Sequence, residues 1–315
     1  MKLKALSHYD GDKDTRFGDC ILIYNNSSLI VYDCGHIKHA EYVESFLLTN
    51  STITSIHIVV SHNDSDHADG VCALLEWLAL RSKFTVKVYT HQYLRHVDVI
   101  IDKVDDGRRN RESLKRALLA EFDNIKKIIE KAQELNCPAV EALKGTDVEG
   151  CTIVGPTVDE FTDVAAKAVD NRENDRIGEG HAEETVMNAA SVQMKCALDN
   201  GDNVLLCGDA SPDYLKNLAD YDIIQLPHHG QEDDAKAIFE KLGGNAFSKA
   251  YLISDNTGSA KNSGGSDNTV KYMKNERYTP AYNTKDQIVD LPAHTETTYS
   301  SSARGRVSLG DLGCI

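Results

Sequence analysis

The residues best suited to chemistry lie in one ten-residue segment that mixes histidine and aspartate with small polar residues. Its sequence is Ser61-His62-Asn63-Asp64-Ser65-Asp66-His67-Ala68-Asp69-Gly70. The segment follows an apolar run, 56–60, that has the length and composition of a buried strand. Calcium loops also alternate acidic residues, but they use oxygen ligands and lack paired histidines. Imidazole together with carboxylate suits zinc, manganese or iron, so the pattern predicts a metal site in a loop at a strand end.

Two later segments repeat the arrangement of a strand followed by side chains that bind metals. The apolar residues 204–206 lead into Cys207-Gly208-Asp209, and residues 223–226 lead into Pro227-His228-His229-Gly230. Each segment alone has an ordinary explanation, because an aspartate often caps a strand and the first loop could be an acidic surface turn. Three such strand ends in one chain favour a single site at which they meet.

The elements that must position these loops alternate between short strands and amphipathic helices. A hairpin is expected over 20–33 around Asn25-Asn26-Ser27, and another over 191–206 around Asp199-Asn200-Gly201-Asp202. Other strands are expected at 56–60, 83–89, 151–154, 223–226 and 249–254, and helices at 40–48 and 71–80. This order predicts an α/β fold class, an αββα sandwich of two sheets flanked by helices. We see no linker, so a single domain over 1–315 is expected.

Two segments depart from this alternation. Residues 111–135 carry apolar side chains at helical spacing, among them Leu114, Leu118 and Phe122, with lysine and glutamate between them. The pattern predicts one long amphipathic helix in an insertion at about 108–137, packed on the sheet rather than bound to a partner. Residues 170–184 are strongly charged and are expected to form an exposed loop.

The bulk composition limits the classes of function. Thirty-four basic residues against 49 acidic residues give a formal charge of −15, which counts against an extended surface for long nucleic acids. No apolar run approaches the ~20 residues of a membrane span, and the first residues become polar too early for a signal peptide. The eight cysteines include no CxxC pair, which favours buried reduced thiols. A soluble cytoplasmic protein is therefore expected, without a membrane partner.

Taken together, these motifs make the chain resemble the metallo-β-lactamase superfamily. Its signature is His-x-His-x-Asp-His, followed by a third histidine, a bridging aspartate in a Gly-Asp pair, and a last histidine. The chain is most similar to the metallo-β-lactamase-like domain of the DNA-uptake channel protein ComEC. That subgroup carries Ser-His-x-Asp-x-Asp-His, Asn-x-x-Ser, Gly-Asp and Pro-His-His-Gly, which this chain has at 61–67, 188–191, 208–209 and 227–230. Residues 17–20 and 31–35 are also similar to the opening Gly-Asp and Asp-Gly strands of the family.

The resemblance implies a two-metal centre. The implied ligands are His62 and Asp64 for one ion, Asp66, His67 and His229 for the other, and Asp209 as a bridge between them. His229 is preferred to His228 because its His-Gly step aligns with the last ligand of the superfamily. Asn188 lies close to the place of the third histidine, for which no histidine of this chain is a good replacement. Supporting or substrate-contacting roles are expected for Asn188, His228, Asp33 and His36, although His36 could be a plain surface residue.

The implied ligands also bear on the identity of the metal. Asp64 and Asn188 stand where most of the superfamily has histidine, so the first metal position is rich in oxygen. Hard oxygen ligands shift the preference from zinc toward manganese or magnesium. The second position keeps two imidazoles and still suits zinc. We therefore expect two divalent ions, Mn²⁺ as the working ion and Zn²⁺ as the occupant of a purified sample, with Mg²⁺ as a further candidate.

The expected reaction is hydrolysis by a hydroxide that bridges the two ions, with Asp64, Asp66 and Asp209 as the catalytic residues. ComEC-like domains are associated with DNA degradation, so the resemblance implies phosphodiester cleavage by a nuclease or a nucleotide phosphodiesterase. The charge of −15 favours a nucleotide or a short nucleic acid over long DNA. Two alternatives stay open. One is hydrolysis of a thioester, lactone or lactam, against which Asp64 counts, and the other is a regulatory protein of this fold without catalysis.

Overall fold

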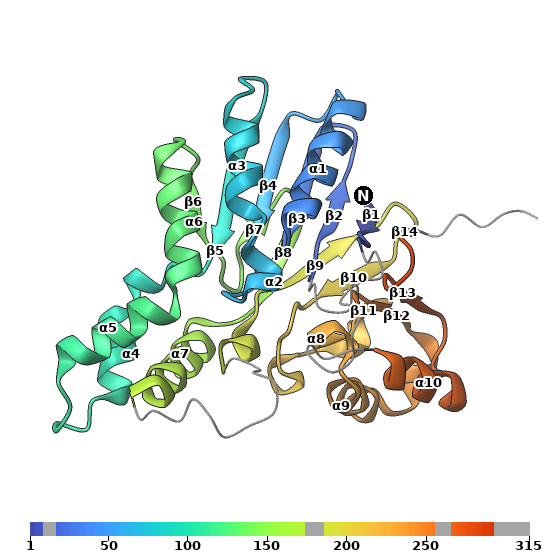
Figure 1. The fold of residues 1–315 in the computed structure, drawn as a ribbon. Coiled ribbons are helices and arrows are strands. Elements are labelled where there is room, and N and C mark those ends of the chain that lie inside the picture. The colour runs from blue at the N-terminus through green and yellow to red at the C-terminus, as the bar shows by residue number, and fades with distance from the viewer. Residues whose placement is uncertain (9–16, 174–185, 256–265, 293–315) are drawn as a thin grey trace, which may run out of the picture.

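The computed structural model describes residues 1–8, 17–173, 186–255 and 266–292, in which the strands form two sheets packed face to face. Helices cover the outer face of each sheet, so the layers run helix, sheet, sheet, helix (Figure 1). The predicted αββα sandwich is confirmed. Among the described residues, no helix combines the length and the apolar character needed to cross a bilayer.

The first sheet is mixed, and the His/Asp segment 61–70 follows one of its strands. Its strands, in spatial order, are β14 (Val289–Leu291), β1 (Lys2–Ala5), β2 (Ile21–Tyr24), β3 (Ser28–Tyr32), β4 (Ser55–Val59), β5 (Thr85–Thr90) and β6 (Ala139–Glu141). The strands from β14 to β3 are antiparallel and those from β3 to β6 are parallel. The hairpin expected at Asn25-Asn26-Ser27 joins β2 to β3.

The second sheet is also mixed and supplies the other two strand ends. Its strands, in spatial order, are β13 (Ala281–Asn283), β12 (Ala250–Ile253), β11 (Ile223–Gln225), β10 (Asn203–Leu206), β9 (Gln193–Ala197), β8 (Cys151–Gly155) and β7 (Asp147–Val148). The strands from β10 to β13 are parallel and those from β7 to β10 are antiparallel. The second expected hairpin joins β9 to β10.

Both faces of the central strands are buried, which explains their nearly continuous apolar runs. In β2 and β3, Ile21, Ile23, Ile30 and Tyr32 belong to the core between the sheets. The side chains that alternate with them pack against the helices of the first sheet instead. A third core lies between the second sheet and its helices, α9 (Glu232–Leu242) and α10 (Asp267–Glu276).

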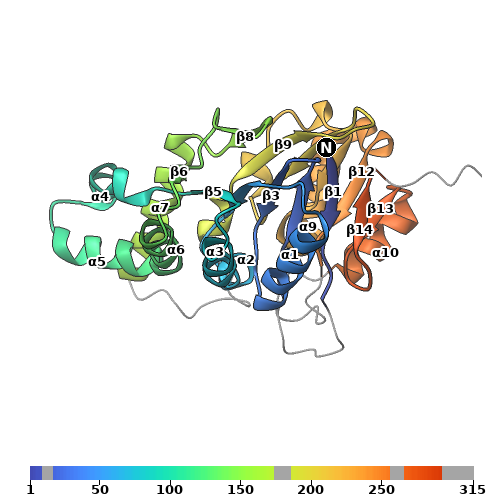
Figure 2. The ribbon, with the colours of Figure 1, turned by 90° about the horizontal axis from the view of Figure 1, so that it is seen from above.

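The helices on the first sheet include a group that extends beyond it. Figure 2 shows α1 (Ile37–Thr49), α3 (Val71–Ala79) and α6 (Asp123–Glu134) in a row along the outer face of the sheet. The group formed by α4 (Val97–Val104), α5 (Arg111–Glu121) and α7 (Val158–Glu173) packs together beside them (Figure 1).

The prediction of one continuous helix over 111–135 is wrong, because the chain forms α5 and α6 with a break at Phe122. Phe122 has φ −100° and ψ 25°, outside the helical region. Its buried ring stacks on that of Tyr93, with centroids 4.7 Å apart, and meets the edge of Phe161 at 5.9 Å. Apolar spacing continues through the break, so sequence periodicity did not show it. The charged segment also differs, since residues 170–173 end α7, while 174–184 lie outside the described residues.

Candidate metal centre

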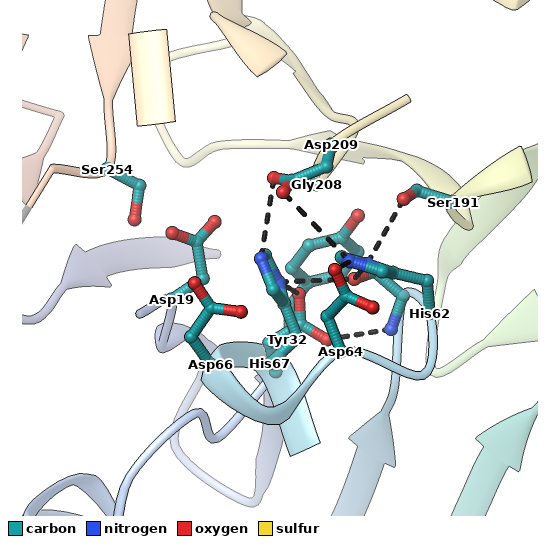
Figure 3. A network of polar contacts seen from close by, with 12 residues as sticks. Asp19, Tyr32, His62, Asp64, Asp66, His67, Ser191, Gly208, Asp209 and Ser254 are labelled. Atoms are coloured by element: carbon teal, nitrogen blue, oxygen red, sulfur yellow. Dashed lines mark hydrogen bonds and ion pairs between the residues drawn. The ribbon is translucent and has the colours of Figure 1, made fainter. Parts of the chain in front are cut away.

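The strand ends singled out in the sequence meet at one edge of the sandwich. Asp33 follows β3, the 62–67 segment follows β4, Asp209 follows β10, and His229 follows β11. The β3–β4 and β10–β11 pairs are parallel, so the carboxyl ends of each pair lie at the same edge of their sheet. Polar side chains can gather there because the chain leaves the sheet as loops. Figure 3 shows the side chains of His62, Asp64, Asp66, His67 and Asp209 gathered around a common centre.

Asp209 lies at the middle of this arrangement. Its carboxylate oxygens are 3.4 Å from Nε2 of His67, 3.9 Å from Nε2 of His62 and 4.0 Å from Nε2 of His229. All four side chains are buried. Nε2 of His62, Nε2 of His67 and Oδ1 of Asp209 make no hydrogen bond to any described residue. Buried polar atoms rarely lack a partner, so three of them around one point fit a bound cation.

Hydrogen bonds on the far side of His62 and His67 hold these rings with Nε2 toward the centre. Nδ1 of His67 is 2.8 Å from Oδ2 of Asp33, whose other oxygen accepts the backbone N–H of Ser61 at 2.7 Å. Nδ1 of His62 lies 2.9 Å from Oγ of Ser61 and 3.2 Å from Oγ of Ser191. Because a carboxylate only accepts, the neutral form of His67 carries its proton on Nδ1 and presents a lone pair at Nε2. This is the orientation that a metal ligand requires.

His229 is held in the same way by residues from two other elements. Its Nδ1 lies 3.0 Å from Oδ1 of Asp19 and 3.0 Å from the carbonyl oxygen of Ser254. Both groups are acceptors, so Nδ1 carries the proton here too. Its Nε2 then faces the centre, 3.3 Å from Oδ2 of Asp66.

The acidic side chains divide between two sides of the His67 ring. In Figure 3, Asp64 and His62 lie on one side of this ring, and Asp66 and Asp19 lie on the other. The Asp64 carboxylate is 3.7 Å from Nε2 of His62. Among the described residues, two groups of three have potential ligand atoms that all lie within 4.8 Å of one another: His62, His67 and Asp209, and Asp19, His67 and His229. The ligand atoms of each group are close enough together to hold a cation.

The electrostatics of the site follow from its four buried aspartates: Asp19, Asp33, Asp66 and Asp209. Burial alone would lower the pKa of His67, but the carboxylates of Asp209 and Asp33 outweigh it and raise this pKa well above its usual value. Burial would likewise raise the pKa of Asp209, but His67 and His229 hold it well below the usual range. Without a cation, protons on the histidines balance the negative charge. A divalent ion would take their place, which couples metal binding to proton release.

Glycines allow the backbone to approach the ligand segment closely. The N–H of Asp19 donates to the carbonyl oxygen of Asp66 at 2.9 Å. A Cβ atom added to Gly18 would lie 1.6 Å from that oxygen, and one on Gly35 would lie 1.9 Å from it. Gly18 also has φ +65°, a region that favours glycine. The Gly-Asp and Asp-Cys-Gly motifs before β2 and after β3 thus support the 62–67 segment.

The turn after β11 determines which of its two histidines faces the centre. His228 and His229 both have φ 53° in the left-handed region, and Gly230 has φ 79°. Such a conformation costs a non-glycine residue about 1–2 kcal/mol, a strain often found at functional sites. It directs Nε2 of His229 toward Asp66 and Asp209, while the ring of His228 has its centroid 6.2 Å from that of His229.

The remaining predicted residues lie at the border of the site. Asn188 is buried in a short 3₁₀ helix, η2 (Val186–Ala190), and its carbonyl oxygen accepts the hydroxyl of Ser191, the residue beside His62. His36 begins α1, where its Nδ1 accepts the N–H of Lys38 at 3.1 Å. Capping a helix is a structural role that accounts for this histidine.

Sequence reasoning gave no role to several residues that contact the candidate ligands or the hydrogen-bond partners of these ligands. They are Asp19, Ser61, Ser191, Gln225 and Ser254. Asp19 had a signal, since it belongs to the Gly-Asp pair at the start of β2. Gln225 had none, because a single polar residue at the end of an apolar strand has no distinctive pattern.

Comparison with known proteins agrees with this geometry at the level of fold. No protein-family model matches the sequence, and no curated protein is significantly similar to it. The structure resembles the metallo-β-lactamase fold protein YhfI from Bacillus subtilis, with a TM-score of 0.50 and 11% identity over 92% of this chain and 98% of that one. A Cronobacter sakazakii metallo-β-lactamase mutant gives a TM-score of 0.34 and 15% identity over 83% of this chain and 90% of its own. The first similarity shows that this chain has the metallo-β-lactamase fold.

Proposed function

We propose that this protein is a dinuclear metal-dependent hydrolase of the metallo-β-lactamase superfamily that cleaves phosphodiesters. One observation carries the proposal: Nε2 atoms of three histidines converge on the carboxylate of Asp209, within 4.0 Å, at the edge of a metallo-β-lactamase fold. Three of these buried atoms, Nε2 of His62, Nε2 of His67 and Oδ1 of Asp209, have no hydrogen-bond partner among the described residues, and a bound cation would satisfy them.

The geometry supports the following division of ligands. His62 and Asp64 would hold one ion, and Asp66 and His229 the other. Asp209 would bridge, since it approaches the histidines of both sides. His67 lies between the two sides, with its ring centroid 4.2 Å from that of His62 and 5.3 Å from that of His229. We assign it to the second ion.

Bound divalent ions would lower the pKa of a coordinated water and neutralise negative charge on the group under attack. The protein's own contribution is to hold the ligands and orient the water. Asp66 and Asp209 are buried and hydrogen-bonded or paired to histidines, so they are suited to positioning. The side chain of Asp64 is 19% exposed, the largest exposure among the six proposed ligands. It therefore borders the side from which a substrate would enter.

The substrate class follows from the ligand chemistry and the charge of the chain. The carboxylates of Asp64 and Asp209 give the first metal position oxygen ligands beside a single imidazole, which favours Mn²⁺ or Mg²⁺ over Zn²⁺. Such ions are commonly paired with phosphoryl oxygens. The similarity of the motifs to ComEC-like domains supports the same class, and the charge of −15 favours a nucleotide or short nucleic acid.

A panel of substrates tests the proposal. Metal-stripped protein would be reloaded with Mn²⁺ or Zn²⁺ and tested on bis-p-nitrophenyl phosphate, single-stranded DNA, a cyclic dinucleotide, a thioester and a β-lactam. We expect phosphodiester turnover with Mn²⁺ that Asp64→Ala abolishes. The matched control is Asp98→Ala, which removes an exposed aspartate of α4 and should leave turnover unchanged. Turnover of the thioester or β-lactam alone would refute phosphodiester cleavage, and native protein without metal would refute any metal-dependent activity.

A further inference from the structure

Gln225 is a buried amide at the end of β11, beside the candidate centre. Its side chain is 1% exposed. Its Oε1 accepts the backbone N–H of Cys207 at 3.0 Å and that of Gly208 at 3.3 Å. Its Nε2 donates to Oδ2 of Asp19 at 2.7 Å. The amide thus joins the loop that carries Asp209 to the carboxylate that holds a histidine.

The orientation of this amide is determined by its neighbours. Two backbone N–H groups can only donate, so the atom that faces them must be the oxygen of Gln225. The amide nitrogen then faces Asp19 and must donate to it. The other oxygen of Asp19 accepts the Nδ1 proton of His229 at 3.0 Å. Each nitrogen that donates in this network therefore meets an acceptor, and the neutral form of His229 keeps the lone pair of Nε2 for the centre.

We propose that Gln225 is a positioning residue that holds the Asp209 loop in place relative to His229. Through Asp19 it also determines that Nδ1, and not Nε2, of neutral His229 carries the proton. The inference rests on the proposed function, since it concerns ligands of the same centre. Steric fit adds to it, because Gly208 has φ +50° and a Cβ atom there would lie 2.9 Å from Oγ of Ser61. The Cys207–Asp209 loop therefore packs closely against Ser61 on one side and is held by Gln225 through its backbone N–H groups.

Glutamine is the residue that this place requires. A glutamate could still accept the two backbone N–H groups, but its second oxygen would face the carboxylate of Asp19 in a buried site. Like charges in such a place repel strongly, so one carboxylate would take up a proton or turn away from its partner. A methionine of similar size would leave the two N–H groups and an oxygen of Asp19 without partners. Either change should disturb His229 and Asp209 together.

The test exchanges the amide and the carboxylate between Gln225 and Asp19. Gln225→Glu alone places two carboxylates face to face. Asp19→Asn alone directs its amide nitrogen at Nδ1 of His229, because its oxygen must accept from Gln225. The double variant restores an acceptor for every donor, since Asn at 19 can donate to Glu at 225 and accept from His229. It also restores the charge of the natural pair.

Metal affinity would be measured by chelator competition, and the Co²⁺ absorption spectrum of each loaded protein would report on the ligand geometry. Each single variant should lose about 10- to 100-fold in affinity for one of two metal equivalents, the usual effect of a residue that supports a ligand. The double variant should recover affinity to within about threefold of the natural chain, with its spectrum restored. Gln193→Met is the matched control, because Gln193 is a buried glutamine on β9 whose Nε2 has no partner among the described residues. It should leave affinity and spectrum unchanged.

The outcomes separate the two proposals. If the natural chain binds no metal, the proposed function fails and this inference fails with it. If the natural chain binds metal and both single variants bind it equally well with the same spectrum, the role of Gln225 is refuted while the proposed function stands. Loss in the single variants without recovery in the double variant would show only that the network supports the fold. That result would also refute the positioning role.

Discussion

Replacing Asp33 by asparagine should weaken metal binding although Asp33 is not a proposed ligand. Its Oδ1 accepts the N–H of Ser61 at 2.7 Å and its Oδ2 accepts from Nδ1 of His67 at 2.8 Å. In Asp33→Asn the oxygen must stay with the Ser61 N–H, so the new NH₂ group faces Nδ1 of His67. A histidine that accepts at Nδ1 carries its proton on Nε2, where it cannot bind a metal.

The expected loss follows from the type of contact. Removing a group that orients a metal-binding histidine commonly costs about 10- to 100-fold in affinity, or about 1.4 to 2.8 kcal/mol. The site is completely buried at Asp33, so water cannot replace the lost acceptor. Chelator competition with Mn²⁺ and Zn²⁺ would measure the affinity. Asp98→Asn, with the same change of charge on the exposed side of α4, is the control and should bind as the natural chain does.

Unchanged metal binding by Asp33→Asn would refute this prediction. If Asp33→Asn folds, as judged by circular dichroism, and binds both equivalents of metal with unchanged affinity, the Nε2 of His67 is not a ligand. The outward hydrogen bonds of His229 would then not identify its Nε2 as a ligand either, because acceptors hold that ring in the same way. Loss of metal without loss of fold would support it.

Three further outcomes are expected. Chelation should lower the melting temperature by about 5 °C in differential scanning fluorimetry, and added Mn²⁺ should restore it. The reason is that a ligand at 100 times its Kd stabilises the folded state by about 2.7 kcal/mol. An unchanged melting temperature would contradict a metal-bound folded state. Asp64→His should raise the ratio of Zn²⁺ to Mn²⁺ bound in a competition measured by mass spectrometry, because it replaces oxygen by imidazole, whereas an unchanged ratio would remove Asp64 from the ligands. Burial lowers the pKa of His91 to about 4, below the ~6.5 of a histidine in an unfolded chain. Between these two values the unfolded state binds more protons than the folded state. The free energy of unfolding should therefore fall by about 2 to 3 kcal/mol as the pH drops from about 6.5 to 4. His91→Gln should lose less stability over this range in urea unfolding, and equal losses in the two proteins would contradict the assignment.

Much of the fold could be predicted because it follows from local patterns. The apolar runs of β2, β3 and β4 and the turn at Asn25-Asn26-Ser27 depend on neighbouring residues alone. The break at Phe122 could not be predicted in this way. It depends on a ring stack with Tyr93, which lies on another element, and the helical spacing of apolar residues is the same on either side of it.

For the candidate site, too, local features could be predicted from the sequence and contacts between distant residues could not. The sequence by itself determined the candidate ligands and the strands that they follow, because strand ends and short His/Asp motifs are local features. Only the tertiary structure decided how these residues are paired. Asp19 and His229 are separated by 210 positions, and Gln225 reaches Asp19 across 206. Their hydrogen bonds exist because two packed sheets bring distant strand ends to one buried edge, where each polar atom must find a partner.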